Sequence, residues 1–468
     1  MLNYIWLALI LIGVAVAALM GRMEALVKGI LAQVEAGVMS IALPLAGILM
    51  LFLGIMRLAE KSGAVNLLSR LIRPVMRRLF PDVPPDHPAM GAMIMNMAAN
   101  FLGLGNAATP LGLKAMRHLD DLNPHKGTAS NAMCTFLAIN TSAITLIPAT
   151  AIGLLAARGV ANPYAIVGTT LVSALCAQIV GIATSKIFQR LPMFRIDPAR
   201  EASENREEES AAVDGDDDET KAPKLRSIGT RGWVLLTAVG VLFLGTILLE
   251  TFPARRAALQ HALGLDEAVR QLDAAPASTA RVAPPGEPAL WVRGLGAFSV
   301  AAIPFMLLFF AVFAFARGLK VYEEFVEGAR EGFQVVIRIM PFLVAMLTAL
   351  AAMRYSGALP LAQRLLTPVL DLIRFPAELL PMALMRPLSG SGSQGVLADL
   401  LTNDTLAVWK KYAAATMYGS TETTFYVLAV YFGSVAIRRT RHALAAGLCA
   451  DATGLLVAVA ICRAFFGA

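Results

Sequence analysis

The sequence predicts an all-α integral membrane protein made of two inverted repeats, each with a re-entrant hairpin and a broken transmembrane helix. Three observations carry this prediction: an apolar composition, a repeat between the two halves of the chain, and polar interruptions at matching places in both. Hydrophobic residues make up 57% of the 468 residues and charged residues 16%, with a mean hydropathy of +0.64. A soluble globular domain is less apolar than this, so the soluble classes are excluded.

Five uncharged runs have about the 20 residues that a helix needs to cross the hydrocarbon core. They span residues 2–20, 36–56, 163–185, 232–249 and 294–316. Two further apolar segments, 127–157 and 412–437, are interrupted by polar residues. The first run lacks the basic residues and the cleavage site of a signal peptide, so we interpret it as a retained helix.

An internal repeat organises the chain. The stretch "SGAVNLLSRLIRPV" at 62–75 aligns without a gap with "SGALPLAQRLLTPV" at 356–369, and residues 23–45 resemble residues 322–344. Self-similarity of this kind indicates two copies of one structural unit.

The same register aligns two pairs of polar interruptions. It places "GLGNAATPLG" at 103–112 opposite "LSGSGSQG" at 388–395, and residues 137–148 opposite residues 417–427. Glycine permits turns, while serine, threonine and asparagine supply side-chain hydrogen bonds. Non-helical backbone at membrane depth survives only where protein or a water-filled cavity satisfies its polar groups.

These interruptions predict two hairpins and two broken helices. The hairpins are expected at 88–118 and 381–402 with tips at 103–110 and 388–395, and the broken helices at 127–157 and 408–433. Interrupted segments at corresponding positions of two halves indicate the central site of a transporter. The alternative is that they are tight helix–helix contacts or surface loops.

The polar residues of these segments are the candidate site, and we expect them to line one water-accessible cavity between the repeats. The candidate substrate- or ion-binding residues are Asn96, Asn100, Asn106, Thr109, Asn140, Thr141, Ser142, Ser389, Ser391, Ser393, Ser420, Thr421, Glu422 and Thr423. Glu422 is the only carboxylate in 412–437, and a charge there is costly unless it faces a cavity or a partner. It is expected to hold a proton, a sodium ion or a cationic group, or alternatively to cap the half-helix that follows. Asp451 is interpreted as a helix–helix partner.

The sequence predicts no cofactor, no metal site and no enzyme. The cysteines lie singly in apolar segments, at Cys134, Cys176, Cys449 and Cys462, without the CxxC spacing of a metal or redox site. The five histidines are scattered, and there is no Walker A pattern, dinucleotide fingerprint or nucleophile elbow. Active transport would therefore depend on an ion gradient.

Charge placement predicts the orientation and the domains. Basic residues flank the acidic segment 201–219 on both sides, which places it in the cytoplasm by the positive-inside rule. If each repeat crosses the membrane an even number of times, the single helix at 232–249 makes the second repeat enter from the opposite side. The two repeats would then be inverted. The net charge of +7 fits loop ends beside anionic lipids, with no nucleic-acid partner.

The predicted domains are a repeat at 1–195, an acidic disordered linker at 196–230, an extra helix at 231–251, a periplasmic loop at 252–292 and a second repeat at 293–468.

Two signatures carry a family resemblance. The stretch "NFLGLGNAATPLGLKAM" at 100–116 resembles spore maturation protein A, while "RPLSGSGSQG" at 386–395 and "YGSTETTFYVLAVYFGS" at 418–434 resemble spore maturation protein B. The resemblance covers residues 1–195 and 290–468. It implies a Gate (nucleoside-recognition) domain, related to the membrane domains of nucleoside and ferrous-iron transporters, and a multi-pass protein of the bacterial inner membrane.

The leading functional hypothesis is secondary transport or facilitated passage of a small polar solute, coupled to H⁺ or Na⁺ where it is active. The solute is nucleoside-like, amino-acid-like or an ion. The alternative is a membrane scaffold or regulator of envelope or spore-type maturation that moves nothing. The expected partners, besides the solute and the coupling ion, are membrane lipids, and the sequence is compatible with a homo-oligomer.

Overall fold

The computed structural model describes residues 2–194, 227–266 and 290–467. Most of the predicted acidic linker and most of the 252–292 loop lie outside these residues. Within the described ranges the regular structure is helical, and the one β-bridge joins Thr128 to Arg439. The expectation of an all-α membrane protein is confirmed.

Six helical segments of the described chain are long and apolar enough to cross a membrane. They are α2 to α3 (Met23–Ala36 and Leu43–Lys61, joined by a π-helical stretch Gly37–Ala42), α9 (Ile166–Phe188), α11 (Thr230–Thr251), α14 (Leu290–Ala316), α15 (Val321–Ser356) and α21 (Ala443–Phe466). The first apolar run forms α1 (Leu2–Leu19). Helices α15 and α21 are not among the uncharged runs of the sequence because both contain charged residues.

Both halves contain the same elements in the same order. In the first half α3 is followed by α4 (Ala64–Leu79), α5 (Pro88–Leu102), α6 (Gly105–Asp121), α7 (Asn131–Thr141), α8 (Ala149–Ala157) and α9. In the second half α15 is followed by α16 (Ala358–Leu372), α17 (Leu380–Leu388), α18 (Gly390–Thr402), α19 (Val408–Ser420), α20 (Thr424–Gly433) and α21. Gly63 and Gly357, at matching positions, both have left-handed backbone with φ of 79° and 91°, which glycine adopts without strain.

The two hairpins turn more tightly than the sequence predicts. Helix α5 ends at Leu102, Gly103 follows it with φ of 79°, and α6 begins at Gly105. Helices α17 and α18 are separated by Ser389 alone. The predicted tips, 103–110 and 388–395, are therefore mostly helical. A helix satisfies its own backbone hydrogen bonds, so an apolar environment favours the shortest possible break.

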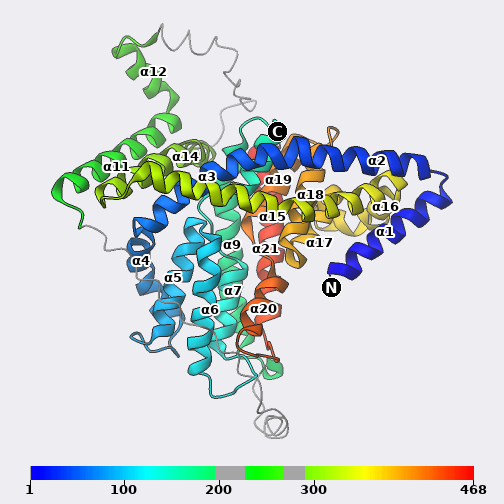
Figure 1. Ribbon diagram of the computed structural model, residues 1–468, viewed down its shortest axis with the longest axis horizontal. Helices are drawn as coiled ribbons and strands as arrows, with labels where there is room; N and C mark the ends of the chain where they lie inside the picture. The colour runs from blue at the N-terminus through cyan, green and yellow to red at the C-terminus, as the bar shows by residue number, and fades with distance from the viewer. Residues whose placement is uncertain (1, 195–226, 267–289, 468) are drawn as a thin grey trace.

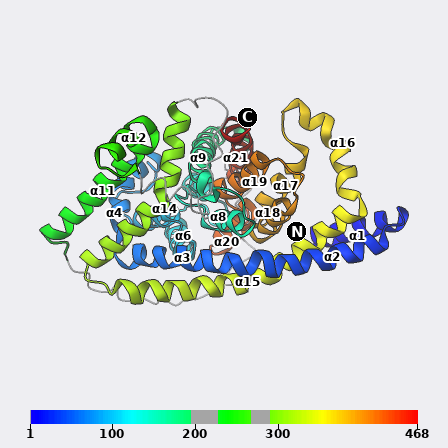
Figure 2. The same cartoon turned by 90° about the horizontal axis from the view of Figure 1, so that it is seen from above.

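Two long helices and two central helices organise the molecule. Helix α3 runs alongside α15 across the structure (Figures 1 and 2). Gly332 allows this close approach, since a Cβ there would lie 2.8 Å from the Cα of Met50. Helices α9 and α21, the last of each half, pack together at the centre, where the Ser173 hydroxyl donates to the Gly454 carbonyl at 2.7 Å. The halves thus share one packed interior.

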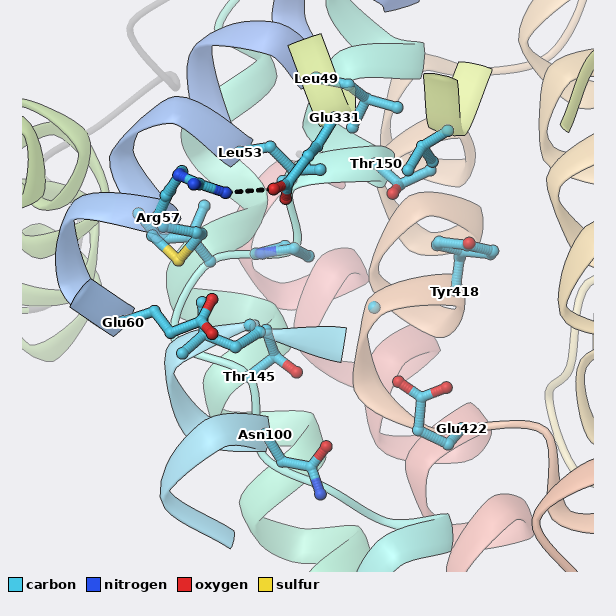
Figure 3. A pocket seen from close by; sticks show the side chains of 18 of the residues that line it. Leu49, Leu53, Arg57, Glu60, Asn100, Thr145, Thr150, Glu331, Tyr418 and Glu422 are labelled. Atoms are coloured by element: carbon cyan, nitrogen blue, oxygen red, sulfur yellow. Dashed lines mark hydrogen bonds and ion pairs between the residues drawn. The ribbon is translucent and has the colours of Figure 1, made fainter. Parts of the chain in front are cut away.

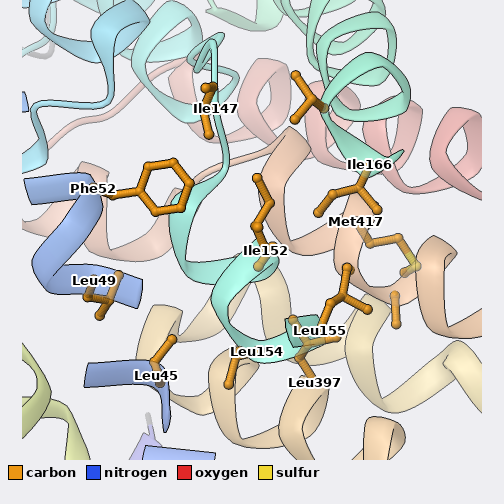
Figure 4. Close-up of a cluster of buried hydrophobic side chains, with 14 of the residues drawn as sticks. Leu45, Leu49, Phe52, Ile147, Ile152, Leu154, Leu155, Ile166, Leu397 and Met417 are labelled. Carbon is orange, nitrogen blue, oxygen red and sulfur yellow. The ribbon is translucent and has the colours of Figure 1, made fainter. Parts of the chain in front are cut away.

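The main hydrophobic core surrounds the first broken helix. Phe52 on α3 and Ile152 on α8 are 3% and 4% exposed, and they face each other together with Leu155, Leu397 and Met417 (Figure 4). Side chains from both halves therefore hold α8 in place, and burying each large apolar side chain stabilises the fold by about 1.5–3 kcal/mol.

The extra helix between the halves packs on α14. The rings of Phe243 and Phe305 stack with centroids 4.0 Å apart. The predicted loop at 252–292 begins with a further helix, α12 (Pro253–Ala262). Proline is favoured in the first turn of a helix and the alanine-rich stretch that follows propagates it, so this part of the predicted loop is helical.

Candidate functional site

A cavity of about 280 Å³ lies where the interrupted segments meet (Figure 3). Its apolar wall comes from α3 and includes Leu49, Leu53 and Met56. Its polar lining comes from the breaks and the helices beside them: Asn100, Thr145, Thr150, Arg386, Tyr418 and Glu422. An apolar wall with a few convergent polar groups is the usual composition of a small-molecule site.

The four interruptions contact one another at this cavity. The Glu422 amide in the second broken helix donates to the Thr141 carbonyl of the first at 2.7 Å. The Leu146 amide donates to the Phe101 carbonyl, 2.8 Å away at the end of α5. In the second half, a Cβ on Gly390 would lie 3.1 Å from the Thr423 hydroxyl. The two broken helices thus share one backbone hydrogen bond, and the first broken helix shares another with the first hairpin, which satisfies backbone groups at membrane depth.

Arg386 is the buried cation of the site. It lies in the last turn of α17, with only 3% of its surface exposed. Its guanidinium donates to the Thr421 carbonyl in the break between α19 and α20. It also lies over the ring of Tyr418, 4.7 Å from the centroid, and its Nη2 is 3.6 Å from Oε2 of Glu422. Arg386 therefore joins the second hairpin to the second broken helix.

Glu422 points into the cavity opposite Asn100 (Figure 3). Half of its side chain is exposed, so its pairing with Arg386 leaves carboxylate surface open to the cavity. The sequence pattern predicted Glu422 as a site residue and did not predict Arg386, although Arg386 is the first residue of "RPLSGSGSQG". A lone arginine beside a glycine- and serine-rich interruption in an apolar segment was the available signal.

A second charged group borders the cavity between the long helices. Arg57 on α3 binds Glu331 and Glu324 on α15, with 3.0 Å from Nε to the Glu324 carboxylate (Figure 3). The Glu324 and Glu331 side chains are both more than a quarter exposed, which limits the stabilisation that these two ion pairs supply. No sequence pattern predicted it, because its members are more than 260 residues apart.

The predicted asparagines form one network beside the cavity. Asn100 lines the cavity and donates from Nδ2 to Oδ1 of Asn140 at 3.0 Å. Asn140 donates in turn to the Phe136 carbonyl at 2.9 Å. Asn96 is fully buried and donates to the Ala108 carbonyl at 2.7 Å, which fastens α5 to α6. Asn100 alone of these three reaches the cavity surface.

The predicted hydroxyls mostly bond the backbone around the breaks. Those of Thr141 and Ser142 donate to the Ala138 carbonyl at 3.0 and 2.7 Å. The Ser389 hydroxyl caps α18 by accepting from the Gly392 amide at 3.0 Å. Helix ends leave several backbone groups without intrahelical partners. These hydroxyls therefore form hydrogen bonds with the backbone at the breaks.

The remaining candidates lie behind the lining. The hydroxyls of Ser393 and Ser420 donate to the carbonyls of Ser389 and Met417. Thr421 and Thr423 are buried in the second break. Ser391 approaches the Ser389 hydroxyl at 3.4 Å. Thr109 is partly buried on α6 and does not line the cavity, and the side chain of Asn106 is outside the described part of the structure.

Comparison with known proteins identifies the relatives of the chain. Spore maturation protein A of Bacillus subtilis (strain 168) is 43% identical over 188 residues, which are 40% of this chain and 95% of the relative. Spore maturation protein B of the same organism is 40% identical over 169 residues, which are 36% of this chain and 95% of the relative. The chain belongs to the spore maturation protein A and B family.

The Gate family, described as nucleoside recognition, matches the spore maturation-type chain at residues 42–158 and 336–438. Each match contains the hairpin and the broken helix of one half. All the cavity-lining residues except Glu331 and Val335 lie inside the two matches. No solved structure matches the chain.

Proposed function

We propose that the chain is a secondary transporter or facilitator of a small polar solute in the bacterial inner membrane. The observation that carries the proposal is the meeting of two hairpins and two broken helices around a cavity that presents Arg386 and Glu422 together. Ionisable residues inside a membrane protein are costly and are retained mainly where they handle a solute or an ion.

The lining favours a solute with both an acceptor end and a donor end. Arg386 and the Asn100 amide suit a carboxylate or carbonyl group, while the half-exposed Glu422 carboxylate suits an amine. The Tyr418 ring provides an aromatic face, and its hydroxyl is fixed by a 2.8 Å hydrogen bond from Gln394. An amino-acid-like or nucleoside-like solute fits this chemistry and a cavity of about 280 Å³.

Alternating access would follow from the repeat. We propose that the halves are inverted with respect to the membrane and rock around the fixed meeting point of the breaks, as in other transporters with broken helices. The short unwound breaks give the hinge positions, since only a few residues need to change their backbone angles.

Uptake into liposomes tests the proposal. Purified protein is reconstituted and offered labelled nucleosides, amino acids and divalent ions under imposed H⁺ or Na⁺ gradients. Transport of at least one class above protein-free liposomes, weakened by Glu422→Gln, supports the proposal. A chain that moves none of them and instead retains stoichiometric envelope proteins through purification would be a scaffold.

A further inference from the structure

Asp451 is a buried carboxylate of the membrane interior that lies outside the cavity lining. It lies on α21 and is 1% exposed. Its Oδ2 accepts a hydrogen bond from the Thr424 hydroxyl at 2.6 Å. Its Oδ1 has no hydrogen-bond partner among the residues that the structure describes, and no described cation lies within ion-pair distance. A carboxylate in this environment is strongly disfavoured as an anion.

The face of α21 that carries Asp451 packs on the second break. Gly447 and Gly454, four residues before and three after it, lie on the same helix face. A Cβ at Gly447 would lie 2.9 Å from Cγ2 of Thr424, and one at Gly454 would lie 2.6 Å from Cγ2 of Thr421. Asp451 therefore faces the break between α19 and α20 at close range.

The break has charged groups on its other side. Arg386 donates to the Thr421 carbonyl, and Glu422 faces the cavity. These two are the charged groups that interact electrostatically with Asp451 within the described structure. The neighbouring helices present uncharged groups here: Thr141 lies 3.4 Å from a Cβ at Gly447, and Ala177 on α9 lies 3.3 Å from one at Gly454. The break therefore separates Asp451 from Arg386, the one cation that interacts with it among the residues that the structure describes.

We propose that Asp451, and not Glu422, is the proton-carrying residue that couples transport to a proton gradient. The inference rests on the proposed transport function. In the described conformation Asp451 is a neutral carboxylic acid held by Thr424. When the break rearranges, the O–H bond of the acid breaks, water takes the proton, and the carboxylate pairs with Arg386 after that guanidinium leaves the Thr421 carbonyl. Reprotonation from the opposite side releases Arg386 and restores the described arrangement.

A proton fits the position better than a metal ion. Among the described residues no group of three or more histidine, cysteine or acidic side chains is placed to hold one. Asp451 also borders none of the described cavities, whereas a sodium ion would need space and several oxygen ligands. A proton needs only the carboxyl group itself.

Infrared spectroscopy of the full chain in lipid tests the assignment without a solute. Wild type at neutral pH should show the carbonyl stretching band of a buried carboxylic acid. Asp451→Asn should lose that band, and the control Glu422→Gln should keep it. Retention of the whole band in Asp451→Asn would overturn the assignment. So would loss of the wild-type band on addition of Na⁺ at constant pH, because that result identifies a sodium ligand.

A chemical probe keeps the proposal testable if Asp451→Asn does not fold. Dicyclohexylcarbodiimide reacts with protonated carboxyl groups in apolar surroundings, and peptide mapping of wild type should place the adduct on Asp451. Modification of Glu422 in place of Asp451 would contradict the proposal. Neither readout involves transport, so failure of every solute in liposomes would count against the proposed function while leaving the protonation result to stand.

Discussion

Replacing Arg386 with alanine should destabilise the protein more than any other single change at the cavity. The side chain is 3% exposed and donates to the Thr421 carbonyl, a charge-assisted hydrogen bond of about 1.5–3 kcal/mol. Its contact with the Tyr418 ring at 4.7 Å adds about 0.5–2 kcal/mol. The Glu422 carboxylate is half exposed and 3.6 Å away, so this pair contributes less than about 1 kcal/mol. We expect a total loss of about 2–6 kcal/mol.

The assay is reversible unfolding in mixed micelles, followed by circular dichroism, with Glu422→Gln as the matched control. That control removes only the ion pair with the half-exposed Glu422 and should cost less than about 1 kcal/mol. Arg386→Lys should fall between the two, because it keeps the charge and loses the planar guanidinium. Equal stabilities of Arg386→Ala and Glu422→Gln would refute the assignment of Arg386 as the link between hairpin and broken helix.

Two further predictions concern packing and capping. Gly332→Val should push α3 away from α15 and cost at least about 1–3 kcal/mol, since its Cβ would meet the Met50 backbone at 2.8 Å; Gly47→Val, where nothing lies within 4 Å, should be far milder in the same unfolding assay. Ser389→Ala should cost about 1 kcal/mol by removing the cap of α18, whereas Ser391→Ala should change stability little, and equal effects of the two would contradict the capping role.

The sequence predicted the fold well where local chemistry determines it. Composition indicated the membrane class, and clusters of glycine, serine and asparagine marked the breaks in both halves. Tip lengths were overestimated, since the same small polar residues that permit a turn also fit inside a helix, as Gly390 to Ser393 do in α18. Helix α15 was not predicted from uncharged runs because its first turn carries Glu323 and Glu324.

The site was predicted in part. The breaks drew attention to Glu422 and Asn100, which line the cavity. The ion pair of Arg57 with Glu331 joins helices from different halves, and only tertiary structure brings them together. Most of the predicted hydroxyls form hydrogen bonds with the backbone at the breaks. The sequence alone does not show whether such a hydroxyl bonds the backbone or a ligand.

Two-sided cysteine labelling measures whether the cavity opens alternately to the two sides of the membrane. Thr150→Cys places one thiol in the lining, in a chain whose own cysteines, Cys134, Cys176, Cys449 and Cys462, are replaced by alanine. Oriented membranes are treated with a membrane-impermeant maleimide from one side or the other. Alternating access predicts labelling from both sides, at rates that change in opposite directions when a transported solute is added. Labelling from one side only, unchanged under every gradient and solute, would contradict it.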